Sequence, residues 1–105
     1  MQKLKDAFKP KEADVTAEIR AFLKAKGIFH WKQWQGPMSS VKGLSDIIGI
    51  YNGRFLAIEV KKPGGKPTLD QVSFLEMVRS CGGVSILAMS VEDVEKGLMV
   101  RQKFE

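Results

Sequence analysis

The sequence predicts an α/β domain in which a mixed central sheet of about four strands is flanked by helices. The strongest observation is an Asn52-Gly53 pair between two apolar segments, which is the typical sequence of a β-hairpin. Apolar residues at helical spacing lie on either side of this hairpin. The predicted order is helix, strand, strand, strand, helix, strand and helix, which begins with the pattern αβββαβ.

The first helix is predicted over residues 11–26, after a lead of residues 1–10 that ends at Pro10. Its apolar positions fall at spacings i, i+4, i+7 and i+8 and form one stripe: Val15, Ile19, Phe22 and Leu23. Gly27 is a typical C-terminal stop for this helix.

The segment "IFHWKQW", residues 28–34, predicts an aromatic-rich strand. We expect at least two of its aromatic residues, Phe29, Trp31 and Trp34, to lie in the core. The alternative is that they form the surface of a dimer.

The predicted hairpin joins strands at residues 46–51 and 54–61. With a two-residue loop, Tyr51 pairs with Arg54, and the same register places Asp46 opposite Glu59. Lys61 lies two residues beyond Glu59 and therefore points to the same face. Both faces are apolar, so we expect helices to cover both, including Ile50 and Phe55 on the face of the charged residues.

Residues 68–71, Thr-Leu-Asp-Gln, match a capping box that begins a second helix, which Gly82-Gly83 ends. The positions that we expect to point inward are Leu69, Val72, Leu75 and either Val78 or Cys81. A fourth strand is predicted over residues 84–89, and Ser90 caps a last helix over about 91–99.

The net charge of +5 is concentrated in the middle of the chain, because residues 24–66 hold eight basic and only two acidic residues. Such a segment suits nucleic acid, although a solvated lysine-rich surface explains it equally well. Cys81 is the single cysteine, which excludes a disulfide framework, and we expect it to be a small buried residue. The sequence has no apolar run of membrane-spanning length, and "MQKLKDAFKPKEAD" lacks the apolar part of a signal peptide, so we expect a cytoplasmic protein.

Two carboxylates directly opposite each other repel and need compensation. Lys61 alone can compensate Asp46 and Glu59 as a structural ion pair. The alternative is a bridging Mg²⁺ or Mn²⁺, hard cations that prefer oxygen ligands and keep several waters. Glu12 is a third candidate, because it lies about 35° from the centre of the first helix's apolar stripe at roughly 100° per residue. Its alternative role is to complement the helix dipole.

The residues Asp46 and Glu59-Val60-Lys61 resemble the signature of PD-(D/E)xK nucleases. The longer pattern "GLSDIIGI…GRFLAIEVKKPGGKPTLDQVSFLEMV…GGVSILAMSVEDVEKGL" resembles the small stand-alone VRR-NUC nucleases of phages and bacteria, from about Glu12 to Leu98. The resemblance implies a restriction-endonuclease-like core and a nuclease domain over residues 11–105. Ser45 departs from it, because many family members have proline there.

The resemblance implies that Asp46, Glu59 and the Val60 carbonyl bind Mg²⁺ or Mn²⁺, and that Lys61 is the catalytic lysine. It assigns Glu12 to the acidic site and Gln71 to catalysis, although Gln71 is also the last residue of the capping box. We expect the DNA phosphates to contact lysines on neighbouring loops: Lys42, Lys62 and Lys66.

The sequence therefore predicts a metal-dependent DNA endonuclease. The resemblance implies a homodimer that cuts branched DNA such as Holliday junctions or flaps. The alternative is a non-catalytic, structure-specific DNA-binding protein that uses the same basic surface.

Overall fold

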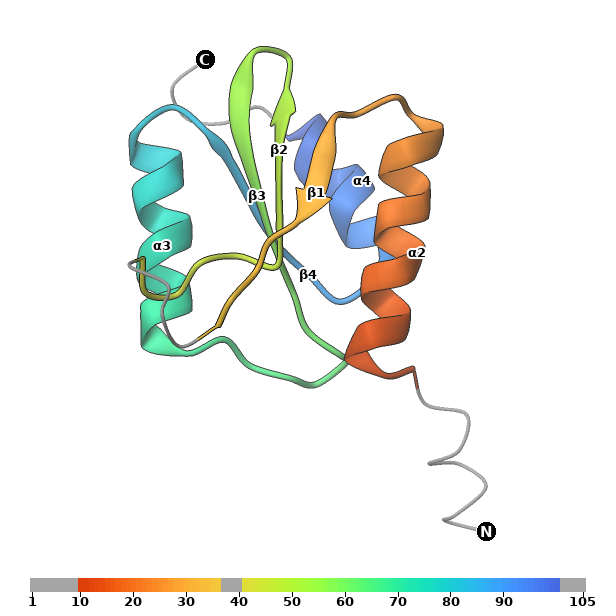
Figure 1. Ribbon diagram of the computed structural model, residues 1–105, viewed down its shortest axis with the longest axis horizontal. Helices are drawn as coiled ribbons and strands as arrows, with labels where there is room; N and C mark the ends of the chain where they lie inside the picture. Colours follow the sequence, from red (N-terminus) through yellow and green to blue (C-terminus); the bar gives the residue numbers. More distant parts are fainter. Residues whose placement is uncertain (1–9, 37–40, 101–105) are drawn as a thin grey trace, which may run out of the picture.

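The computed structural model describes residues 10–36 and 41–100, so most of the predicted N-terminal lead lies outside the described residues. The described elements follow the predicted order (Figure 1): α2 (Glu12–Ala25), β1 (His30–Lys32), β2 (Ile47–Tyr51), β3 (Arg54–Val60), α3 (Leu69–Ser80), β4 (Val84–Ala88) and α4 (Val91–Met99). The fold is a mixed α/β fold, as the sequence predicts.

The four strands form one sheet in the order β1-β2-β3-β4. Strand β2 is antiparallel to both β1 and β3, whereas β3 and β4 are parallel and are connected through α3. Asn52 and Gly53 both have positive φ, 51° and 77°, as a tight hairpin turn of the I′ type requires. Tyr51 pairs with Arg54, so the predicted register of the hairpin is confirmed.

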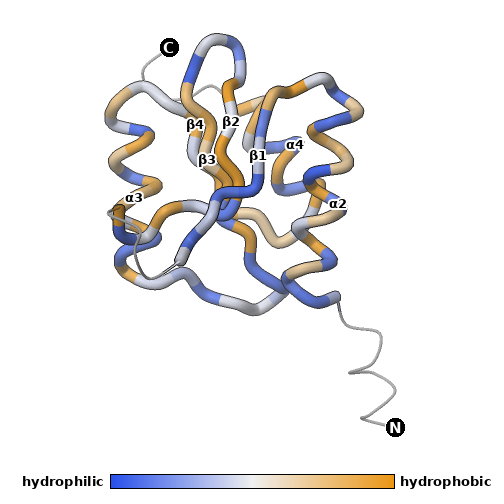
Figure 2. The backbone as a smooth tube through the Cα atoms, in the orientation of Figure 1, coloured by the Kyte–Doolittle hydropathy of each residue, from blue (hydrophilic) through white to orange (hydrophobic). Residues whose placement is uncertain are grey.

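Helices lie on both sides of the sheet, with α3 on one side and α2 and α4 on the other (Figure 1). The larger core packs the stripe of α2 and Val94 of α4 against alternate residues of β2, β3 and β4. The smaller core packs Leu75 and Val78 of α3 against Ile48 and Ala57. Hydrophobic segments of the chain accordingly converge on the centre of the sheet (Figure 2).

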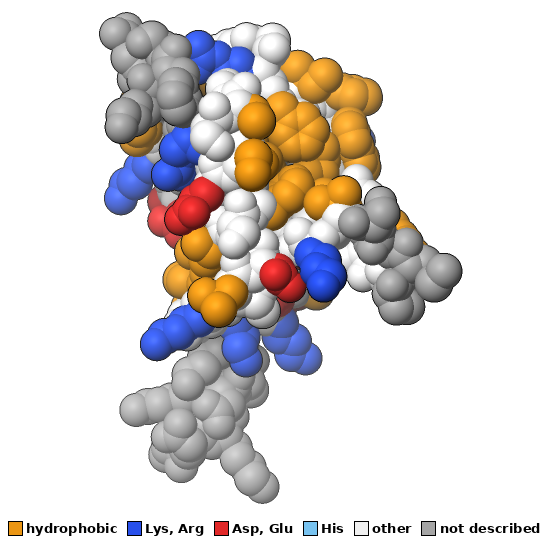
Figure 3. Space-filling view, turned by 90° about the vertical axis from the view of Figure 1, so that its left-hand side faces the viewer, with side chains coloured by type: hydrophobic (Ala, Val, Ile, Leu, Met, Phe, Trp, Pro, Cys, Tyr) orange, Lys and Arg blue, Asp and Glu red, His pale blue; other side chains and the backbone are white. Residues whose placement is uncertain are grey.

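Helix α3 covers only part of its face of the sheet. Ile50 is 50% exposed and Phe55 is 46% exposed, so the expectation that a helix covers them is wrong. The expectation of core aromatics is also wrong, because Phe29, Trp31 and Trp34 are all exposed. The reason is that α3 packs on β3, β4 and Ile48 of β2, and leaves β1 and the hairpin ends of β2 and β3 open. Hydrophobic side chains gather on the surface seen from the α3 side (Figure 3).

Helix α3 begins and ends where the sequence predicts, but fewer of its residues are buried than expected. Thr68 caps the helix and Gly82 follows its end with a φ of 91°. Leu69 and Cys81 are exposed, so their predicted burial is wrong, whereas Leu75 and Val78 are buried. Both errors fall at the ends of α3, since Leu69 is its first residue and Cys81 is its C-cap. Across residues 10–36 and 41–100, the chain has no helix with the length and apolarity to cross a membrane.

Candidate active site

The predicted acidic residues meet where β2 begins and β3 ends, at the lower end of the sheet in Figure 1. Ile47 pairs with Ile58, and this register places Asp46, just before β2, opposite Glu59. Lys61 follows β3 directly, and its backbone N–H donates to the Ala88 carbonyl at 2.9 Å. The first turns of α2 and α3 lie at the same end of the molecule (Figure 1).

Backbone hydrogen bonds on both sides hold Asp46 in place. Its Oδ2 accepts from the Val60 N–H at 2.7 Å, so the carboxylate itself ties β2 to β3. Its carbonyl accepts from the Gln33 N–H at 2.8 Å, which connects it to the segment after β1. The sequence did not predict either contact. Together they fix the position of the Asp46 carboxylate at the start of β2.

Glu59 is 1% exposed, which is unusual for a carboxylic acid. Its Oε1 atom is buried and has no hydrogen-bond partner among the described residues. Its Oε2 atom lies 3.6 Å from Nζ of Lys61. Lys61 therefore partners one oxygen of Glu59 and leaves the other without compensation.

The pKa of Glu59 is raised from 4.5 to about 8. Burial is the largest cause, because it disfavours the charged carboxylate. The neighbouring carboxyl of Asp46 raises the pKa further through hydrogen bonding and charge, and the charge of Glu12 adds to it, while Lys61 lowers it. Without a cation, the site therefore retains a proton at neutral pH.

Glu12 is the first residue of α2 and its side chain is exposed. It is close enough for its charge to influence the pKa of Glu59. However, the part of the chain that the structure describes holds no group of three or more His, Cys, Asp or Glu residues with the geometry of a metal site. The close acidic residues are thus Asp46 and Glu59. Two carboxylates and an unpartnered buried oxygen fit Mg²⁺ or Mn²⁺, which retain several waters.

Gln71 is engaged in the capping box of α3. Its Oε1 accepts from the Thr68 N–H at 2.8 Å, and its own N–H donates to Oγ1 of Thr68 at 3.1 Å. The capping role is therefore confirmed, and a catalytic role of Gln71 stays a prediction.

The three lysines predicted to contact DNA, Lys42, Lys62 and Lys66, are all exposed. Lys62 and Lys66 lie on the loop that connects β3 to α3, which passes beneath the sheet in Figure 1. Lys and Arg side chains gather at the lower end of the space-filling view (Figure 3). The positive charge of Lys62 and Lys66 therefore follows directly after the end of β3 that holds Glu59.

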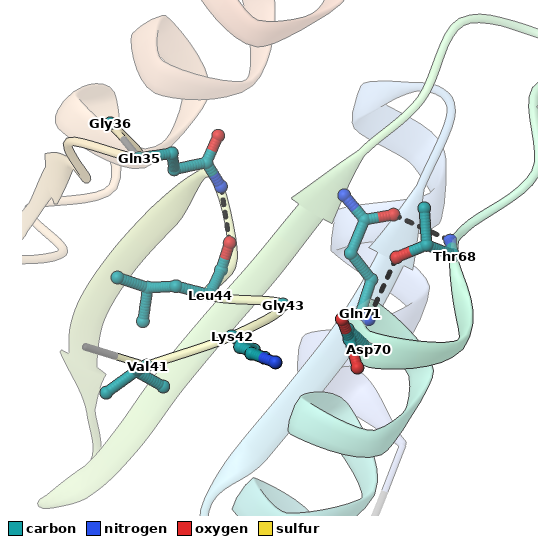
Figure 4. Close-up of a pocket in the computed structure, with 9 residues that line it drawn as sticks. All are labelled: Gln35, Gly36, Val41, Lys42, Gly43, Leu44, Thr68, Asp70 and Gln71. Atoms are coloured by element: carbon teal, nitrogen blue, oxygen red, sulfur yellow. Dashed lines mark hydrogen bonds between the residues drawn. The ribbon is translucent and has the colours of Figure 1, made fainter. Parts of the chain in front are cut away.

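A cavity of about 470 Å³ lies between the first turn of α3 and the loop before β2 (Figure 4). Its lining includes Lys42 on the loop and Thr68, Asp70 and Gln71 at the start of α3. The lack of a side chain at Gly43 allows the loop to approach α3 closely, because a Cβ there would lie 2.0 Å from the Asp70 carbonyl oxygen. The sequence did not predict this contact, since the two segments are distant in the chain.

No known family model matches the chain, and no curated protein matches it.

Proposed function

We propose that this protein is a metal-dependent DNA endonuclease with a restriction-endonuclease-like core. The observation that carries the proposal is the buried Oε1 of Glu59, which has no partner among the described residues and lies in a site shared with Asp46 and Lys61. A purely structural ion pair would use both carboxylates as charged partners of Lys61, whereas here Glu59 keeps a proton at neutral pH. A bound cation would displace that proton and compensate both carboxylates.

Asp46, Glu59 and the Val60 carbonyl would hold Mg²⁺ or Mn²⁺. When bound, such a cation supplies a more acidic water and polarises a phosphoryl oxygen. Lys61 contributes a positive charge and hydrogen-bond donors beside the acidic pair, where its ammonium can orient the attacking water and stabilise the negative charge that develops on the phosphate. The exposed lysines around the site bind the phosphates of the flanking DNA.

The substrate that fits this small domain is branched DNA, which the protein cuts as a homodimer. Every described residue belongs to the core, its loops or the site, so the described part has no separate module for reading a base sequence. Two symmetric strands need two sites related by a twofold axis. The exposed face of β1 and β2, with Trp31, Ile50 and Phe55, offers an apolar surface for the second copy.

The test is cleavage of end-labelled single-stranded, duplex, flap, forked and four-way-junction DNA in Mg²⁺, Mn²⁺ or EDTA. We expect the wild type to cut branched DNA only with metal. We expect Lys61→Ala and Asp46→Asn to lose at least about 100-fold in rate, since each removes a group that acts on the developing charge or holds the metal. Lys96→Ala, on α4, is the control for loss of an exposed lysine and should cut normally.

An intact fold with no cleavage of any substrate in either metal contradicts the proposal. If that protein still binds junctions, the basic surface is the function, and the protein is a non-catalytic DNA-binding protein. Cleavage that persists in Asp46→Asn and Lys61→Ala would instead place the active site elsewhere or expose a contaminant.

A further inference from the structure

We propose that Trp34 is a stacking platform for an unpaired base of the DNA beside the cleavage site. The inference rests on the proposed function in one respect only, since it takes DNA as the ligand. It adds a substrate preference, for DNA with unpaired nucleotides close to the acidic pair over continuous duplex.

The position of Trp34 follows from the pairing of the edge strand. Lys32 pairs with Ile47, and the next residue, Gln33, donates its N–H to the Asp46 carbonyl at 2.8 Å. Trp34 therefore follows directly after the residue that is hydrogen-bonded to the predicted metal ligand. The backbone of Trp34 thus lies at the end of the sheet that holds Asp46.

The indole ring of Trp34 is exposed and lies against the backbone. The side chain is 61% exposed, although tryptophan is normally largely buried. A Cβ at Gly36 would lie 1.7 Å from Cζ2 of the Trp34 ring, so a larger residue at Gly36 would displace the ring. The ring thus contacts the protein at Gly36 and leaves more than half of the side-chain surface open to a stacking partner.

Hydrogen bonds on either side fix the segment that carries Trp34. The Gln33 amide accepts from the Trp31 indole N–H at 2.9 Å and donates to the Trp34 carbonyl at 3.2 Å. On the far side, Nε2 of Gln35 donates to the Leu44 carbonyl. This exposed aromatic side chain is therefore presented by a tethered segment, which lowers the entropy lost when a ligand binds.

Nucleobases are the ligand chemistry that matches this surface. Aromatic side chains bind single-stranded nucleic acid by stacking on base faces, which are hidden within a continuous duplex, and basic side chains hold the backbone. Lys32 and Lys42 are exposed on the neighbouring segments. The cavity beside Trp34 is lined without an aromatic residue, so it cannot itself provide the stacking.

The test is the affinity of the full chain for DNA in EDTA, where no metal-dependent cleavage occurs. Fluorescence anisotropy would compare a forked DNA that has unpaired arms with a blunt duplex of the same length. We expect Trp34→Leu to weaken fork binding by roughly 5- to 150-fold, which corresponds to about 1–3 kcal/mol per stacked base, and to leave duplex binding unchanged. Trp34→Phe should retain most of the fork affinity because it keeps an aromatic face.

Met99→Ala is the control, because it removes another large exposed apolar side chain, at the end of α4 and away from the face of β1 and β2. An equal effect of Trp34→Leu on fork and duplex, or no effect on either, would overturn the inference. Cleavage is measured separately. A wild type that binds forks through Trp34 but never cuts them would refute the proposed nuclease and leave the stacking site standing.

Discussion

At the scale of single residues, Glu59 is the one charged residue that is buried among residues 10–36 and 41–100. It occupies a strand position at which an apolar residue would pack without penalty, and it is nevertheless almost completely buried. Burying an ionisable group without full compensation destabilises a fold. We infer that the acidic pair is maintained for binding and not for stability.

Without metal, the stability of the protein should decrease with rising pH between about 4.5 and 8. The pKa of Glu59 is raised in the folded state, so the unfolded chain loses this proton first, and each further rise in pH favours unfolding. At about 1.4 kcal/mol per pKa unit, the decrease in the free energy of unfolding is on the order of a few kcal/mol. Urea denaturation in EDTA across this pH range measures it.

Glu59→Gln is the control for this pH dependence, since glutamine has a similar shape and no titration. The variant should show a flatter profile and exceed the wild type in stability at pH 8. An equally steep profile in Glu59→Gln would show that Glu59 is not the titrating group.

The two roles of Gln71 can be separated by substitution. Gln71→Glu retains a side-chain oxygen for the Thr68 N–H, and glutamate is a preferred residue at this position of a capping box. We therefore expect Gln71→Glu to keep wild-type stability and Gln71→Ala to lose about 1 kcal/mol in urea denaturation. If Gln71→Glu cuts at the wild-type rate, and Gln71→Ala loses cleavage only in proportion to its folded fraction, Gln71 acts only as a helix cap. Loss of cleavage in a stable Gln71→Glu would instead show a catalytic role.

At the scale of elements, the sequence predicts the features of helices and strands that depend on residues close together in the chain. The Asn52-Gly53 turn defined the hairpin register, and the capping box defined the start of α3. The turn also predicted that Asp46 faces Glu59. Exposure was harder to predict, because the periodicity of a segment identifies its apolar face but not how far a neighbouring helix extends over it. Phe55 and Leu69 show this error.

Contacts between distant loops leave no signal in a single sequence. The fit of Gly43 against the first turn of α3 is such a contact. Gly43→Ala should destabilise the protein by about 2–3 kcal/mol in urea denaturation, because it combines a φ of 71° with a collision against backbone. Gly64→Ala is the matched control. It has a φ of 84° but nothing within 4 Å, so it should lose only about 1 kcal/mol. Equal losses would show that the loop does not dock on α3.

At the scale of the whole molecule, the sheet has one face that is closed and one that is half open. Helices α2 and α4 close the first face, and α3 leaves β1 and the hairpin ends of β2 and β3 uncovered on the second. Trp31 pairs with Ile48 and so lies on the same face as Ile50, while the ring centroids of Phe29 and Trp31 are 5.7 Å apart. This continuous apolar surface supports the proposed homodimer.

The dimer prediction can be tested with a charge on that surface. Ile50→Lys should convert a dimer to a folded monomer, because a lysine at the centre of the interface would lose its hydration without a partner. Leu69→Lys is the control, since Leu69 is 86% exposed at the start of α3, away from β1 and β2. Light scattering after size exclusion measures the mass. A monomeric wild type at micromolar concentration would contradict the prediction.

The most direct test of the central claim, that the acidic pair is a divalent-cation site, is a calorimetric titration of Mn²⁺ at pH 7.5. We expect one site per chain that releases protons when it fills, because the cation displaces the proton held by the raised pKa of Glu59. Buffers with different ionisation enthalpies measure this release, and binding should be lost in Asp46→Asn and Glu59→Gln. Binding that persists unchanged in both variants, or a wild type that binds no cation, would show that the acidic pair is not a cation site.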